Sequence, residues 1–127
     1  DVLEQGLKAL GMDVLKVPIY QTVVPARFIE RAASVFKQPV DWVTATSSSC
    51  VDHLVEALRA AGWRELIAKL RWASIGPVTS AAVRTHGGVI ACEARVSTIE
   101  GLVQAMVMKG GKGRGVSRAT ASKASAI

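Results

Sequence analysis

Cysteine is scarce in this sequence, and long hydrophobic runs are absent. The chain of 127 residues holds two cysteines, Cys50 and Cys92, which show neither CxxC spacing nor the spacing of metal ligands. No uninterrupted apolar run approaches the roughly 18 residues that a membrane-spanning helix needs. Together with the lack of a signal-peptide pattern, these features favour a soluble cytoplasmic protein with reduced thiols over a disulfide scaffold or a membrane protein.

The signature motifs of several enzyme classes are missing as well. No GxSxG surrounds the serines, which argues against the nucleophile elbow of a hydrolase. No Walker loop or GxGxxG is present, and the segment IGPVTSA, residues 75–81, holds too few glycines to bind dinucleotide phosphates. The two histidines, His53 and His86, lack metal-ligand spacing. We therefore predict no metal site and assign both histidines to helix-capping or surface positions.

Acidic residues are absent from the end of the chain, and this absence explains most of the net charge. Residues 1–108 hold 11 lysines and arginines against 10 acidic residues, whereas residues 109–127 hold 5 basic residues and no acidic one. The last segment is rich in Gly, Ser, Ala and Lys without apolar periodicity, so we expect a disordered, solvated tail. A non-specific contact of the tail with a polyanion is the alternative. A nucleic-acid-binding function would rest on this tail alone, because the rest of the chain is nearly neutral.

The beginning of the chain predicts a helix followed by extended backbone. Residues 2–10 have the apolar spacing of a helix, which Gly11 would close, and residues 12–17 predict a short strand. Pro18 and Pro25 then bracket a β-rich segment. Because proline cannot donate to a sheet ladder, we expect an edge strand or a crossing linker there. Since the chain starts inside an element, we also expect it to be a fragment of a longer protein.

After this segment the sequence predicts alternating helices and strands. The apolar spacing first indicates a helix that must end before Pro39, because the residue before a proline avoids the helical conformation. A strand, a loop and a helix then follow one another three times. The predicted strands span residues 40–44, 72–75 and 89–92. Short connections between such elements imply an α/β fold of the flavodoxin or Rossmann type, a parallel sheet with helices on both faces and right-handed crossovers.

The helices between these strands are predicted from buried apolar stripes and from glycines at their ends. One helix has its stripe within residues 51–58 and ends at Gly62, and a short helix follows over residues 63–70. Another helix runs from the turn at Gly76 to its stop at Gly87. The three tryptophans fall on core positions of these elements and are given no ligand role.

The last helix is expected to begin with a capping box. Ser97 and Glu100 have the required spacing, so each side chain would bond the backbone N–H of the other residue. The expected buried stripe of this helix consists of Ile99, Leu102, Val103 and Met106.

Three loops lie at the carboxyl ends of the predicted strands, where parallel sheets gather ligands. Each loop leads into a helix, whose amino terminus offers unpaired N–H groups and about half a positive charge. The loops also carry hydroxyls, namely Thr46, Ser47, Ser48 and Ser49 in the first, Thr79 and Ser80 in the second, and Ser97 and Thr98 in the third. Ordinary capping explains any single loop, but three at one edge favour a cleft for a ligand with several carboxylates or phosphates.

Tyr20 is the single tyrosine of the chain, and it lies in the proline-bracketed segment rather than in a core stripe. Its phenol could donate a proton or a hydrogen bond into a cleft beside this segment. The alternative is a packing tyrosine whose hydroxyl is satisfied within the protein.

Four segments carry a resemblance to a known family. They are VPIYQTVVP, DWVTATSSSCV, ASIGPVTSAAVRTHG and STIEGLVQA, in this order and spacing. The sequence resembles the carboxyl-terminal half of uroporphyrinogen-III synthase over about residues 1–107. The resemblance implies a monomeric two-domain enzyme that holds hydroxymethylbilane between two α/β domains, one inserted in the other and joined to it by a two-stranded linker. It also implies that neither a metal nor an organic cofactor takes part. We expect no nucleic-acid or membrane partner, because most of the chain is nearly neutral and no apolar run is long enough to span a bilayer.

The same resemblance implies a division of this chain and a reaction. Residues 1–17 would end the inserted domain, residues 18–25 would form the return linker, residues 26–108 would form the second half of the terminal domain, and residues 109–127 would remain the basic tail. The implied enzyme is a lyase of haem and tetrapyrrole biosynthesis. It removes water from the hydroxymethyl group, inverts the last pyrrole ring, ring D, and closes the macrocycle to uroporphyrinogen III.

The family pattern assigns roles to individual residues. Its linker tyrosine falls on Tyr20, which we expect to assist departure of the hydroxyl as water, because a phenol can donate a hydrogen bond to a leaving oxygen. Its threonine after the IGP turn falls on Thr79, and the serines of its first loop fall on Ser47 and Ser49. Thr79 and Ser47 would position acetate or propionate arms. The full set of candidate substrate-binding residues in the first two loops is Thr46, Ser47, Ser48, Ser49, Gly76, Val78, Thr79 and Ser80. The family often has a proline where this chain has Ser48, which predicts a looser turn.

Much of the implied enzyme has no counterpart in this sequence. The first half of the terminal domain and nearly all of the inserted domain are lacking, so we expect the 127-residue chain to be inactive alone. The alternative function is a non-catalytic α/β module that binds a polycarboxylate or phosphorylated ligand. This alternative uses the same helix termini but gives Tyr20 no chemical role.

Overall fold

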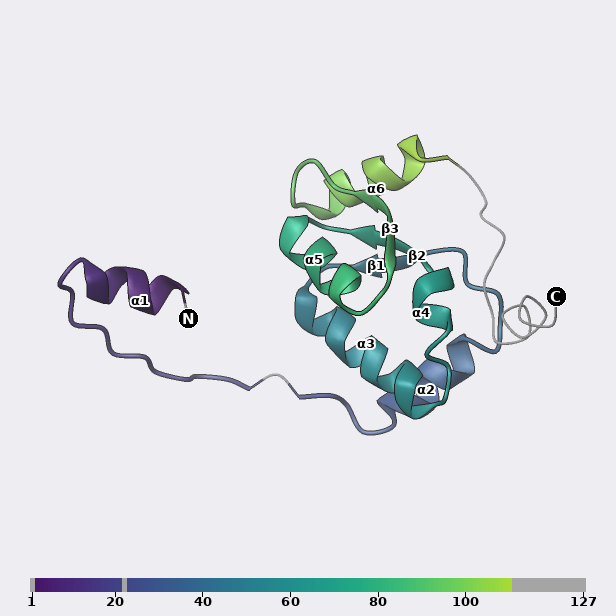
Figure 1. Cartoon of the computed structure of the whole chain (residues 1–127), viewed down its shortest axis with the longest axis horizontal. Coiled ribbons are helices and arrows are strands. Elements are labelled where there is room, and N and C mark those ends of the chain that lie inside the picture. The colour runs from purple at the N-terminus through teal and green to yellow at the C-terminus, as the bar shows by residue number, and fades with distance from the viewer. Residues whose placement is uncertain (1, 22, 111–127) are drawn as a thin grey trace.

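A computed structural model describes residues 2–21 and 23–110 of the chain (Figure 1). Within this part it contains six helices and three strands. In chain order they are α1 (Val2–Ala9), α2 (Phe28–Val35), β1 (Val43–Ala45), α3 (Ser48–Ala60), α4 (Leu66–Lys69), β2 (Arg71–Ser74), α5 (Pro77–Thr85), β3 (Val89–Glu93) and α6 (Ile99–Met108). None of the helices described is long and apolar enough to cross a membrane.

The three strands form one parallel sheet in the order β1-β2-β3. Val43 pairs with Trp72, which in turn pairs with Ile90, and the register between β2 and β3 shifts after Trp72. The predicted parallel α/β fold is confirmed. The predicted strand positions are confirmed with boundaries that differ by a few residues at their ends.

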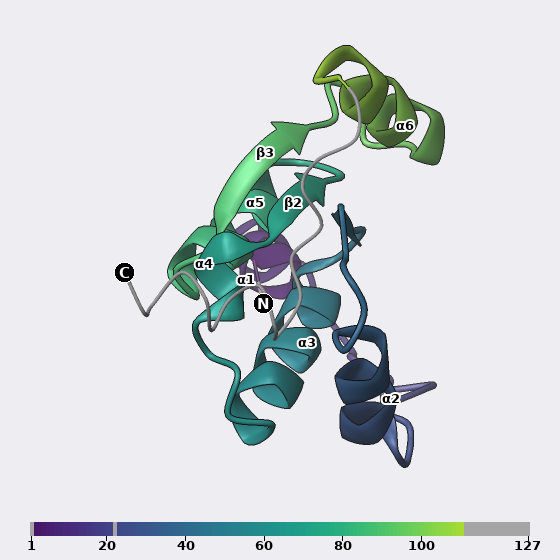
Figure 2. The same ribbon diagram turned by 90° about the vertical axis from the view of Figure 1, so that its right-hand side faces the viewer.

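The two faces of the sheet are covered unequally, and Figure 1 shows the sheet between α3 and α6. Trp72 points to the face covered by α3, α4 and α5, where it joins the larger core cluster, to which α2 adds Phe36. Its neighbour Ala73 points to the opposite face and packs with Leu102 of α6. Figure 2 shows α6 across the sheet from α3 and α2. Right-handed crossovers between strands added in one direction explain why the helices that connect the strands, α3, α4 and α5, share one face.

The predicted end of α3 at Gly62 is confirmed, and the structure adds the residue that caps its start. Ser47 is the N-cap residue, and its hydroxyl accepts a hydrogen bond from the N–H of Cys50 at 3.2 Å. At the other end Gly62 has a φ of 75°, a left-handed conformation that favours glycine. The N–H of Trp63 donates to the carbonyl of Leu58 at 2.8 Å, so the chain closes the helix and turns back toward the core.

The strand predicted over residues 12–17 is wrong. Helix α1 forms as expected, but the backbone from residue 12 to residue 21 is in neither a helix nor a strand. Figure 1 shows this segment extending away from the sheet, so its N–H and C=O groups have no neighbouring strand to pair with. The described residues between Pro18 and Pro25 also form no strand. Of the two predicted alternatives, an edge strand and a crossing linker, only the linker remains for them.

The capping box predicted for the last helix is also wrong. Thr98, not Ser97, is the N-cap, and its hydroxyl accepts from the N–H of Gly101 at 3.0 Å. A Cβ at residue 101 would lie 2.2 Å from the carbonyl oxygen of Val96, so this helix start requires glycine. Because the helix begins one residue later than predicted, Glu100 lacks its expected partner. The buried stripe is also smaller than predicted. Leu102 is buried and Met106 packs against it, whereas Ile99 and Val103 are exposed.

Candidate functional site

Three helices begin at the same edge of the sheet. Helix α3 follows β1, α5 follows β2 and α6 follows β3, and the carboxyl ends of parallel strands share one edge. The N-cap residues are Ser47, Gly76 and Thr98. The first N–H groups of each helix have no acceptor within the helix, so this edge concentrates hydrogen-bond donors and partial positive charge. We call it the carboxyl edge.

The first loop combines a capped helix start with hydroxyls that a ligand can reach. The hydroxyl of Ser47 serves the N–H of Cys50 and also lies 3.2 Å from the hydroxyl of Ser49. Thr46 and Ser49 are exposed, while Ser47 and Ser48 are half-buried. Capping thus occupies the hydroxyl of Ser47, while Thr46 and Ser49 remain exposed at the edge.

The second loop presents backbone rather than side chains. Thr79 and Ser80 are only 4% and 0% exposed, and the hydroxyl of Ser80 donates to the carboxylate of Glu93. Pro77 opens the helix and has no N–H, which leaves the N–H groups of Val78 and Thr79 as the donors of its first turn. The exposed side chain of Val78 lies beside them.

Ser74, the last residue of β2, organises this second loop and was missed by sequence reasoning. Its side chain is fully buried; the hydroxyl donates to the carbonyl of Gly76 at 2.8 Å and accepts from the N–H of the same residue at 3.2 Å. These two bonds close the turn between the strand and α5. A serine at a strand end directly before a Gly-Pro turn is the signal that could have identified it.

Glu93, the last residue of β3, is a second residue that sequence reasoning missed. Its carboxylate accepts a hydrogen bond from the buried hydroxyl of Ser80 in α5. Glu93 also borders a groove of about 380 Å³ between β3 and α6, together with Arg95, Gln104 and Lys109. Sequence spacing gave no signal for this contact, because 13 residues separate the two partners.

The second and third loops touch each other at the carboxyl edge. A Cβ on Gly76 would lie 2.9 Å from the hydroxyl oxygen of Ser97, so the two loops approach as closely as a glycine allows. Ser97, displaced from its expected capping role, therefore lies against the start of α5. Two of the three predicted loops are brought together directly by this contact.

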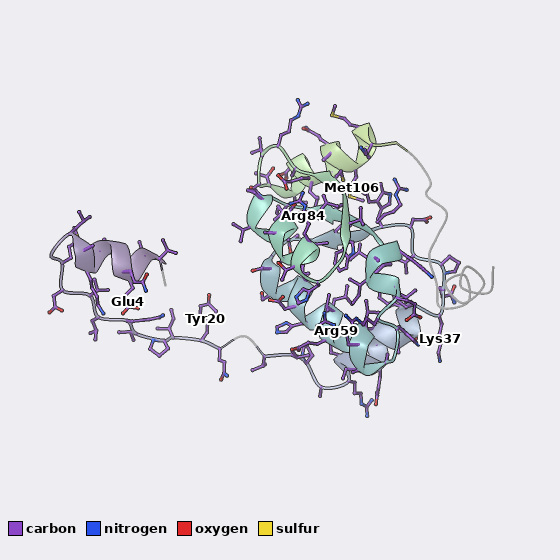
Figure 3. The ribbon with its side chains drawn as sticks, viewed as in Figure 1. Glu4, Tyr20, Lys37, Arg59, Arg84 and Met106 are labelled. Atoms are coloured by element: carbon purple, nitrogen blue, oxygen red, sulfur yellow. The ribbon has the colours of Figure 1, made fainter. Side chains whose placement is uncertain are left out.

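Tyr20 does not join the loops in this structure. It is 83% exposed and lies in the segment that extends away from the sheet, as Figure 3 shows. Neither a core contact nor a cleft surrounds it among the described residues, so the packing alternative has no support from its surroundings. Its proposed role requires a different placement of this segment.

No cluster of three or more metal-ligating side chains occurs among the residues that the structure describes. His86 ends α5, where its Nε2 lies 2.7 Å from Asp52 and its Nδ1 lies 3.5 Å from a guanidinium nitrogen of Arg59. Because arginine can only donate, Nδ1 is the acceptor and Nε2 carries the proton toward Asp52. His86 therefore ties α5 to α3.

Both cysteines are free thiols, as predicted. Cys50 is exposed in the first turn of α3, and Cys92 is half-buried on the α6 face of β3. Burial raises the pKa of the Cys92 thiol, and the positive charges of Arg71 and Lys109 offset part of this effect. Cys92 is therefore a packing residue that stays protonated.

The described residues form a parallel α/β fold in which three helices begin at the carboxyl edge, the edge at which ligands bind in such sheets. Comparison with known sequences identifies the family within this fold class. The chain belongs to the uroporphyrinogen-III synthase HemD family, whose sequence profile matches residues 1–104. It is also 28% identical over 108 residues to a uroporphyrinogen-III synthase from Synechococcus elongatus (strain ATCC 33912 / PCC 7942 / FACHB-805).

The match covers 82% of this chain but 41% of the cyanobacterial protein. The chain thus spans less than half the length of the curated relative that it matches. No solved structure shows a significant match to the chain.

Proposed function

We propose that this chain is the carboxyl-terminal portion of a lyase that converts hydroxymethylbilane to uroporphyrinogen III, with loss of water and inversion of ring D. Family membership supports the reaction class. The observation that carries the proposal is the convergence of three helix starts at the carboxyl edge. The substrate has eight carboxylates on a flexible chain of four pyrrole rings, and such a ligand suits an edge rich in N–H donors.

In this proposal the first two loops hold acetate and propionate arms. The N–H groups of Ser48 and Ser49 start α3, and those of Val78 and Thr79 start α5. The exposed hydroxyls of Thr46 and Ser49 add further donors. Thr79 and Ser80 contribute through their backbone and their packing rather than through their buried hydroxyls. Holding both ends of the linear substrate together would supply much of the rate enhancement.

Tyr20 has the role of hydrogen-bond donor to the departing hydroxyl in this proposal. The proposed division assigns it to a linker between residues 18 and 25, and in the complete enzyme this linker would bring the phenol to the carboxyl edge. No metal and no organic cofactor is required, because the step is a loss of water followed by carbon–carbon bond formation.

Isomer analysis tests the proposal. Hydroxymethylbilane would be supplied to the complete protein that contains this chain, and the products oxidised and separated as type I and type III porphyrins. We expect the type III isomer to dominate, whereas hydroxymethylbilane alone closes to type I. A type I product at the uncatalysed rate would refute the proposed reaction. The 127-residue chain, assayed in parallel, is expected to be inactive.

A non-catalytic function is the second candidate, and the placement of Tyr20 favours it. Because this phenol is exposed and distant from the loops, the chain by itself has the binding edge without the proposed proton donor. On this alternative the protein binds a polycarboxylate or phosphorylated ligand without converting it. Tight binding of hydroxymethylbilane by the complete protein, with only type I product, would support the alternative.

A further inference from the structure

Ser80 and Glu93 join two elements directly beneath the carboxyl edge. Ser80 lies one turn into α5 and is completely buried, and its hydroxyl donates to the carboxylate of Glu93 at the end of β3. A buried hydroxyl without a partner would be costly, so this contact is a requirement of the fold around Ser80. It also fixes where the first turn of α5 stands relative to β3.

Two other contacts hold the same turn from different sides. Ser74 closes the backbone before α5 through its bonds to Gly76, and Ser97 of the third loop packs against Gly76. The start of α5 is therefore held by the end of its own strand, by the loop after β3 and by Glu93. Of these three, Glu93 alone brings a charged group to the edge.

We infer that Glu93 is a positioning residue, which acts through Ser80 to aim the N–H groups of Val78 and Thr79 at a carboxylate of the substrate. The inference rests on the proposed function, because that function supplies the ligand. It also reassigns Ser80 from a direct substrate ligand to a part of the support beneath the ligand.

The charge of Glu93 makes the inference specific. A carboxylate at an edge that binds carboxylates repels the ligand, so the charge itself lowers the affinity. The hydrogen bond to Ser80 has the opposite effect, since it preorganises the donors of α5. Removing the charge while keeping the hydrogen-bond acceptor should therefore leave the affinity unchanged or increase it, whereas removing the acceptor should reduce it.

A matched pair of substitutions separates the two effects. Glu93→Gln keeps an acceptor oxygen at similar length, and Glu93→Met keeps the length without an acceptor. Ser80→Ala removes the donor from the other side. Glu56→Gln serves as the control for loss of one negative charge, because Glu56 is exposed on α3 and has no place in the site.

The first measurement needs no ligand. Amide chemical shifts of the 127-residue chain are recorded by NMR, and the signals of Val78 and Thr79 are compared among the variants. We expect both signals to move in Glu93→Met and in Ser80→Ala and to stay in place in Glu93→Gln and Glu56→Gln. Melting temperatures identify any variant that is not folded, and for such a variant the partner substitution across the same hydrogen bond decides the question. Unmoved signals in the folded Met and Ala variants would overturn the positioning role.

The second measurement titrates the complete protein that contains this chain with uroporphyrin III, a stable octacarboxylate, and follows binding by fluorescence. Glu93→Met and Ser80→Ala should each weaken binding by about tenfold, and the double variant should be no weaker than either, because both remove the same contact. Glu93→Gln should bind as tightly as the unaltered chain or more tightly. Equal losses in the Gln and Met variants would contradict the inference and assign the effect to the charge itself.

Negative results of the two measurements contradict different hypotheses. Absence of probe binding by the complete, unaltered protein would count against the proposed function, and the ligand-free amide shifts would still decide whether Glu93 positions α5. Normal binding with unmoved amide signals in the Met and Ala variants would reject the role of Glu93 and leave the proposed function intact.

Discussion

Helices α1 and α3 have similar amphipathic sequences but opposite surroundings. Helix α3 buries Val51, Val55 and Leu58 in the larger core cluster. Helix α1 has no buried residue, since Leu3 is exposed and Leu7 is only half-buried. Apolar periodicity predicted both helices correctly. The comparison shows that an apolar stripe predicts a helix with one face to be covered. It does not predict whether other residues of this chain cover that face.

The largest difference between α3 and the segment around α1 should be the loss of stability when a leucine is shortened to alanine. Leu58→Ala in α3 would leave a cavity in the core, and we expect a loss of about 2–5 kcal/mol in unfolding free energy, measured by urea denaturation. Leu10→Ala, beside α1, removes the same atoms from an exposed position and should leave the denaturation midpoint unchanged. A large effect of Leu10→Ala would show that the first segment packs against the rest of the chain.

Replacing glycines by alanine should give a smaller difference in stability between α1 and the helices packed on the sheet. Gly101→Ala places a Cβ 2.2 Å from a backbone carbonyl in the first turn of α6, so we expect a loss of about 1–3 kcal/mol as the loop shifts. Gly6→Ala in α1 meets no atom within 4 Å and should raise the helicity of the first segment without changing the stability of the rest. Circular dichroism with thermal denaturation measures both, and equal effects would contradict the described start of α6.

The first segment should matter for chemistry even where it does not matter for stability. In the complete enzyme, Tyr20→Phe should reduce turnover by about 100-fold while leaving the affinity for uroporphyrin III unchanged, because only the phenolic hydroxyl is lost. Thr46→Val is the matched change at the carboxyl edge and should weaken affinity instead. Unchanged turnover of Tyr20→Phe, measured as type III porphyrin formed per minute, would remove Tyr20 from the mechanism.

Surface ion pairs should give the smallest effects in both regions. Asp52 is about half exposed where it meets His86, so Asp52→Asn should cost less than about 1 kcal/mol in unfolding free energy. Glu4 and Lys8 form a pair at 2.8 Å along α1, and Glu4→Gln should lower only the helicity of this segment. A loss well above 1 kcal/mol for Asp52→Asn would show that the link between α3 and α5 is part of the core rather than a surface contact.

Local signals predicted most of the fold. These signals involve residues only a few positions apart, so they can be recognised without knowing the rest of the chain. Examples are the glycines at positions 11 and 62, the proline after Gly76 and the apolar stripe of α3. The prediction of a capping box at Ser97 and Glu100 was wrong because local spacing alone does not decide which residue caps α6. Two adjacent hydroxyls compete for the N-cap, and the close approach of Gly101 to Val96 decides in favour of Thr98.

The sequence by itself determined the alternating elements, the parallel sheet and the edge at which three helices begin, because periodicity, chain direction and turn residues act locally. The tertiary structure alone decided which hydroxyls face inward. It buried Thr79 and Ser80, paired Ser80 with Glu93 and brought Ser97 against Gly76. Such contacts join residues far apart in the chain, and their energies depend on burial and distance, which no spacing in the sequence records.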